Sequence, residues 1–211
     1  AGFMLVAGLL LSFGVALVPA GYFTMSYPGG GMSGLVLRTL VGSMLVALLV
    51  EVFFRGVAMG IFLRAMRPAA ALGMCAAFFA LVCAMIPPPG LNVPDPEAGR
   101  TGFELMRLML SRFADWRSVF GDFVPMLALG FVLSYARWRT ASLWLPVGLH
   151  GGWLFSNALL AKLSATTASG GAAISGGFLQ QGLIPLVAII LAGLLAHYIT
   201  AEEVHESTVE I

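Results

Sequence analysis

Six long apolar stretches limit what this chain can fold into more than any other feature. They lie near residues 2–23, 35–63, 69–86, 119–136, 141–163 and 178–200. A membrane-spanning helix takes about 20 predominantly apolar residues. Charged residues make up 10 % of the chain, against roughly 25 % in an ordinary soluble domain. We therefore expect an all-α polytopic membrane helix bundle of about six transmembrane helices, which excludes a soluble enzyme and a nucleic-acid-binding protein.

The stretches form a single predicted transmembrane domain over residues 1–211. Turn-rich breaks at 27–34, 87–90 and 164–177 separate neighbouring helices, and four glutamates make 201–211 an acidic, solvated tail. The first stretch has no basic region before it and no clear small-residue cleavage site. We interpret it as a membrane helix rather than a signal peptide.

Residues 103–116 have a different pattern from the apolar stretches. Polar residues recur at helical spacing opposite a row of methionine, leucine and aromatic residues. This pattern predicts an amphipathic helix lying in the membrane interface. The alternative is an ordinary helix packed on the other segments.

Basic residues in two short loops predict the orientation in the membrane. Arg64 and Arg67 follow the second stretch, and Arg137 and Arg139 follow the fourth. Short loops rich in arginine stay on the cytoplasmic side, so six helices place both termini in the cytoplasm. The net charge of +1 gives no reason to expect nucleic acid as a partner. The expected partners are the lipid bilayer and other membrane-protein subunits.

Two charged residues lie inside an apolar stretch, where burying a charge is unfavourable. Glu51 and Arg55 fall deep in the second stretch, where an ionisable side chain costs about 2.5 kcal/mol or more and faces a partner or a water-filled cavity. Their spacing of four residues places both on one helical face, so they can pair with each other. The pair is either part of a functional site or an ion pair that only locks the bundle.

His150, in the fifth stretch, is the third candidate. Rise along the helices places it at a depth similar to that of Glu51 and Cys83. Gly148 and Gly152 flank it at a spacing that lets another helix approach closely, and they also leave room beside the imidazole. A histidine hydrogen-bonded within the core is the simpler interpretation.

The remaining candidates for metal or cofactor chemistry are few. One glutamate and one intramembrane histidine are too few for a catalytic zinc site, which takes three protein ligands. Cys75 and Cys83 lie in an apolar run without metal-site spacing, and we interpret them as core thiols. We expect no metal and no cofactor.

Two runs, Glu51 to Gly56 (EVFFRG) and Arg137 to Phe155 (RWRTASLWLPVGLHGGWLF), carry a family resemblance. Together with a phenylalanine-bearing third stretch, they resemble the CAAX protease and bacteriocin-processing family, also called the CPBP or Abi family, over residues 35–160. The resemblance implies a polytopic membrane protein, in a bacterial-type inner membrane, and glutamate-dependent intramembrane endopeptidase activity. The family pattern is Glu-Glu-x-x-x-Arg, then Phe-x-x-x-His, then His-x-x-x-Asn or a variant of it.

Part of that pattern is present. Its second glutamate corresponds to Glu51, its arginine to Arg55, its phenylalanine to Phe79 and its last histidine to His150. In family enzymes the last histidine and the asparagine are understood to stabilise the oxyanion. The resemblance therefore implies catalytic roles for Glu51, Arg55 and His150.

The other part is altered. The first glutamate is Val50, the first histidine is Cys83 and the asparagine is Leu154, while Asn157 lies one turn beyond on the same face as His150. The first glutamate and first histidine are understood to activate the attacking water, which requires a general base within hydrogen-bond reach. Valine cannot accept a proton, and a thiol in an apolar wall is a poor substitute for imidazole.

Three functions follow from these residues. The first is a non-catalytic family member that acts as a scaffold or accessory subunit of a membrane complex. The second is an active endopeptidase that uses Glu51 as base with His150 and Asn157. The third, a small transporter, has little support because no inverted repeat is visible.

Overall fold

The computed structural model describes residues 1–19, 21, 23–26, 31–86, 99–116, 119–166 and 183–209. Its helices are α1 (Gly2–Leu17), α2 (Met32–Glu51), the π-helix η1 (Val52–Ala58), α3 (Met59–Ala65), α4 (Pro68–Ala84), α5 (Thr101–Ser111), the 3₁₀ helix η2 (Arg112–Ala114), the π-helix η3 (Val119–Phe123), α7 (Val124–Thr140), α8 (Trp144–Leu163) and α10 (Leu183–Val209). Two short strands, β1 (Phe23–Met25) and β2 (Ser164–Thr166), pair antiparallel and tie the end of α1 to the end of α8.

A helix lies in each of the six predicted apolar stretches, which confirms the helical bundle. By length and composition, two stretches of the described residues can cross a membrane: Met32–Ala65 and Val119–Thr140. Three further apolar helices are shorter: Gly2–Leu17, Pro68–Ala84 and Pro185–Tyr198. The count of six spans therefore stays a prediction.

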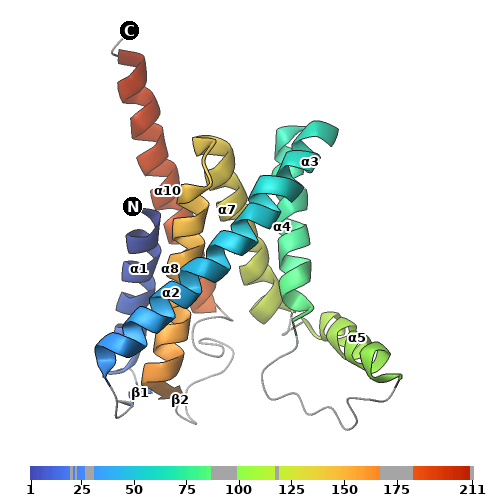
Figure 1. Ribbon diagram of the computed structural model, residues 1–211, viewed down its shortest axis with the longest axis vertical. Coiled ribbons are helices and arrows are strands. Elements are labelled where there is room, and N and C mark those ends of the chain that lie inside the picture. The colour runs from blue at the N-terminus through green and yellow to red at the C-terminus, as the bar shows by residue number, and fades with distance from the viewer. Residues whose placement is uncertain are drawn as a thin grey trace.

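α8 is the central helix of the bundle. It packs against α1, α2 and α7, and Figure 1 shows α2 crossing the bundle diagonally in front of it. Most side chains of α8 are buried, including those of His150, Ser156 and Asn157. These polar residues lower the hydropathy of α8, and a helix surrounded by protein tolerates them because they face other helices rather than lipid.

Two tight turns connect the helices at one end of the bundle. α4 begins with Pro68 at its first position, where the missing N–H costs no hydrogen bond. α7 ends because Ala141 adopts a left-handed conformation with φ 51°. Figure 1 shows the α3–α4 and α7–α8 turns at the upper end of the bundle, and β1, β2 and α5 at the lower end.

The segments outside the apolar stretches differ in part from expectation. The amphipathic helix is present as α5 and η2, and it buries Met109 while it exposes Phe103 and Leu110. α10 continues to Val209, through residues expected in the solvated tail. Residues 164–166, expected in a loop, form β2 because β1 offers them a pairing edge. The predicted break at 27–34 is too long, because α2 already begins at Met32. Residues 27–30, 87–90 and 167–177 of the predicted breaks lie outside the described residues.

Glycines bring α1 and α8 into backbone contact, as the Gly148 and Gly152 spacing predicts. A Cβ atom on Gly148 would lie 3.0 Å from the backbone nitrogen of Phe3. A Cβ atom on Gly152 would lie 2.7 Å from the carbonyl oxygen of Phe3 and 3.1 Å from the nitrogen of Ala7. These glycines are therefore occupied by helix packing and do not open a space beside His150.

Gly152→Ala is expected to destabilise the protein by about 1–3 kcal/mol, the usual cost of overpacking a core. The added methyl group meets backbone atoms, which cannot rotate away, so α1 and α8 must separate. Thermal melting of the purified protein measures the loss. Gly8→Ala on α1 is the matched control, because a Cβ atom there meets nothing within 4 Å. Equal melting temperatures for the two variants would contradict the close approach.

Candidate functional site

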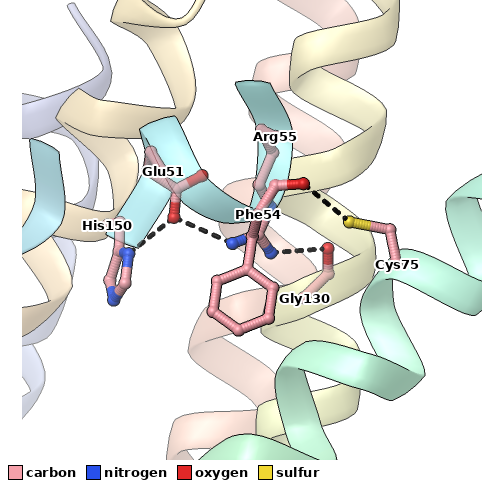
Figure 2. Close-up of polar contacts among 6 residues, drawn as sticks. All are labelled: Glu51, Phe54, Arg55, Cys75, Gly130 and His150. Carbon is pink, nitrogen blue, oxygen red and sulfur yellow. Dashed lines mark hydrogen bonds and ion pairs between the residues drawn. The ribbon is translucent and has the colours of Figure 1, made fainter. Parts of the chain in front are cut away.

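Glu51 and Arg55 lie at the junction of α2 and the π-helix η1, and both are essentially inaccessible to solvent, with exposed fractions of 0 % and 1 %. The Nη1 atom of Arg55 donates a hydrogen bond of 2.9 Å to Oε1 of Glu51. Its Nη2 atom donates to the carbonyl oxygen of Gly130 on α7, at 3.1 Å (Figure 2). Arg55 therefore also ties η1 to α7, so the pair is more than a contact within one helix.

The π-helix sets the local geometry of this pair. In η1 the Met59 N–H bonds to the carbonyl oxygen of Phe54, five residues earlier. The same oxygen accepts a hydrogen bond from the thiol of Cys75 on α4, at 3.3 Å (Figure 2). A carbonyl that is displaced from the regular α-helical hydrogen-bond pattern can accept a second hydrogen bond in this way. Single π turns inside α-helices are frequent at functional sites.

His150 completes the cluster from α8. Its Nδ1 atom lies 2.6 Å from Oε1 of Glu51, and its exposed fraction is 5 %. An ionised carboxylate only accepts hydrogen bonds, so Nδ1 is the donor in this contact. Figure 2 shows the other ring nitrogen on the edge that faces away from Glu51. The three candidate residues expected from the sequence are thus brought together around one carboxylate oxygen.

Phe79 covers the cluster from α4. The guanidinium carbon of Arg55 lies 4.5 Å from the centroid of the Phe79 ring, a distance typical of a cation–π contact. The same ring meets the imidazole of His150 edge to face, with centroids 5.7 Å apart. Phe79 is itself buried. An aromatic wall therefore separates the charged groups from the rest of the core.

Some polar capacity in the cluster is not used. Oε2 of Glu51 and Nε of Arg55 are buried and have no hydrogen-bond partner among the described residues. Buried polar atoms of this kind are uncommon in native structures. The cluster can therefore accept one further hydrogen bond at the carboxylate without losing an existing one.

The comparisons with known proteins identify the fold family. The family model of the type II CAAX prenyl endopeptidase Rce1-like proteins matches residues 32–156. The chain belongs to this family. No curated protein and no solved structure matches the chain. The matched segment contains Glu51, Arg55, Phe79 and His150, whereas α1 and α10 lie outside it.

The altered positions of the CAAX endopeptidase-like motifs are apolar or half-buried. Val50, Cys83 and Leu154 are partly buried and pack against the main hydrophobic core. Both cysteines are free thiols. No side chain at these three positions contributes a carboxylate or imidazole, so the Glu51 carboxylate and the His150 imidazole lack the first glutamate and first histidine of the resembled pattern beside them.

Asn157 does not join the cluster. It is buried, and its Nδ2 atom donates to the carbonyl oxygen of Trp153 on its own helix, at 2.9 Å. Its Oδ1 atom has no hydrogen-bond partner among the described residues. In the part of the chain that the structure describes, no three His, Cys, Asp or Glu side chains form a group that could hold a metal ion.

Two contributors to the cluster could not be found from the sequence. The carbonyl oxygen of Gly130 carries no signal, because every residue has one. Packing explains why a glycine occupies position 130. A Cβ atom there would lie 3.0 Å from the carbonyl oxygen of Ala76 and from the Phe79 ring. The sequence predicts only a core thiol at Cys75, because its hydrogen bond to the carbonyl oxygen of Phe54 depends on the π-helix.

Proposed function

We propose that this chain is a non-catalytic member of the CAAX endopeptidase-like family that serves as a scaffold or accessory subunit of a membrane complex. One observation carries the proposal: the Glu51 carboxylate is held by both Arg55 and His150, while the two positions that activate water in the family pattern are Val50 and Cys83. Hydrolysis of an amide needs a free general base that can reach a water molecule. Here the carboxylate is engaged in holding three helices together.

The proposal includes the finer features of the membrane topology. Six spanning helices place both termini on the cytoplasmic side of an inner membrane, and α5 lies in the opposite interface. The exposed side chains of Phe103, Met106 and Leu110 on α5 support this position. Apolar side chains on one side and charged side chains on another are what an interfacial helix requires.

An active glutamate-dependent endopeptidase is the second candidate. It is supported by the free Oε2 atom of Glu51 and by the contact between Glu51 and His150. A carboxylate that orients an imidazole is a common arrangement in hydrolytic sites. In this alternative a small opening of α8 would admit water to the cluster.

A cleavage assay distinguishes the two. The purified protein in liposomes is incubated with a prenylated peptide that ends in a CAAX sequence. We expect no cleavage above the background of empty liposomes, and we expect the chain to co-purify in fixed ratio with another membrane protein from its native membrane. Cleavage that disappears in Glu51→Gln would overturn the non-catalytic assignment.

A further inference from the structure

Four arginines gather at the end of the bundle where the α3–α4 and α7–α8 turns lie. Arg64 and Arg67 belong to the α3–α4 turn, and Arg137 and Arg139 lie in the last turn of α7. α4 packs against α7, and Figure 1 shows the two turns at the same end. We call these four residues the basic end.

The charges of the basic end are not neutralised within the described residues. Two other arginines have acidic partners, since Arg55 pairs with Glu51 and Arg112 with Asp122. None of the four arginines of the basic end makes an ion pair with a described residue. Their side chains are exposed in the first turn and half-buried in α7. Within the described residues, the basic end therefore carries positive charge without an acidic partner.

The aliphatic parts of the two α7 arginine side chains pack against the bundle. The Nε atoms of Arg137 and Arg139 are buried and have no hydrogen-bond partner among the described residues, although both residues are partly exposed. Long basic side chains lay their apolar stems along protein and hold the charged head toward water. The partial exposure of both residues fits guanidinium heads that are directed toward the lipid headgroups.

Exposed aromatic residues indicate that the basic end lies at the level of the lipid headgroups. Trp138 lies between Arg137 and Arg139 in the chain and is 48 % exposed, and Trp144, the first residue of α8, is 78 % exposed. Tyr198 on α10 is 63 % exposed. Tryptophan and tyrosine are enriched at the level of the lipid headgroups. The aromatic residues therefore place the arginines beside phosphates of the membrane surface.

Helix dipoles explain only part of this arrangement. Cations are favoured at the C-terminal end of a helix, which suits Arg64 in α3 and both arginines of α7. Arg67 precedes the first residue of α4, where the dipole disfavours a cation. The helix dipole therefore leaves the position of Arg67 unexplained.

We propose that the basic end binds the phosphate-bearing headgroups of anionic lipids. The chemistry that it recognises is a phosphodiester with net negative charge, held by guanidinium groups that form paired hydrogen bonds with phosphate oxygens. The proposal is independent of whether the Glu51 cluster is catalytic.

Lipid titration of the delipidated protein in neutral detergent tests this. Phosphatidylglycerol is expected to raise the melting temperature and to remain bound in native mass spectra, whereas phosphatidylcholine is not. Each arginine replaced by glutamine is expected to weaken the affinity for phosphatidylglycerol about fivefold, as near-surface basic residues do. Arg64→Gln/Arg67→Gln and Arg137→Gln/Arg139→Gln are the two test variants.

Arg38→Gln/Arg107→Gln is the matched control, because it removes two exposed arginines from α2 and α5 rather than from the basic end. It is expected to bind phosphatidylglycerol as the wild type does. An equal loss in control and test variants would overturn the proposal, as would phosphatidylglycerol binding that does not weaken with added salt. A melting-temperature increase of the same size with inorganic phosphate would assign the site to a free anion instead. The salt dependence is measured on the wild type and remains decisive if a variant does not fold.

Discussion

Glu51→Ala is expected to lower the free energy of unfolding by about 3–5 kcal/mol, the usual cost of breaking a buried ion pair by removing one partner. Arg55 would keep its hydrogen bond to Gly130 and its contact with Phe79, but its charge would be buried without a counter-ion. The Nδ1 atom of His150 would lose its acceptor as well. Unfolding in a mixed-micelle titration measures the difference.

The double variant Glu51→Leu/Arg55→Met is the control for this result. It removes both charges together, and buried ion pairs replaced by apolar residues of similar volume are often as stable as the original. The double variant should therefore unfold at a higher denaturant concentration than Glu51→Ala. A single variant as stable as the wild type would show that the pair is not buried in the membrane-embedded protein.

Val50→Glu/Cys83→His is expected to convert the protein into a measurable endopeptidase, because it supplies the two groups that the family pattern uses to activate water. A positioned general base contributes about 10²–10⁴-fold to a rate, and the double variant should exceed the wild type by that order. The prenylated CAAX peptide in liposomes is the substrate of the assay. Neither single variant should show cleavage, since each lacks the other half of the pair.

Val50→Gln/Cys83→His is the matched control. Glutamine has nearly the size of glutamate but cannot act as a base. Equal rates for the glutamate and glutamine variants would contradict the assignment of Val50 as the missing base. Cleavage by the wild type at the rate of the double variant would contradict the non-catalytic assignment itself.

Much of the fold follows from one-dimensional signals in the sequence. Apolar stretches predict where helices lie, and the i, i+4 spacing predicts that Glu51 meets Arg55. Depth along the helices predicts that His150 reaches the same level. These predictions succeed because each depends on rise and rotation within a single regular helix.

Other features depend on contacts between helices or on backbone irregularity, and the sequence does not show them. The π-helix shifts hydrogen bonds by one residue, and the glycine within it, Gly56, does not by itself indicate a π turn. Depth along the helix singles out Cys83, but it does not predict that the thiol of Cys75 hydrogen-bonds to the carbonyl oxygen of Phe54 beside the cluster. The contribution of Gly130 is a backbone atom. Prediction of such contacts requires the arrangement of the helices in three dimensions.

The backbone contact between α1 and α8 has a consequence for the time course of synthesis. α1 leaves the ribosome well before α8, and at about 5–20 residues per second the interval is on the order of ten seconds. During that interval α1 lacks the helix that its closest backbone contacts require. The glycine face of α8 therefore packs against α1 only after α1 has entered the bilayer. The β1–β2 pairing can form only after α8 is complete. Newly made chains should pass through a stage in which α1 is open to proteases or chaperones of the membrane.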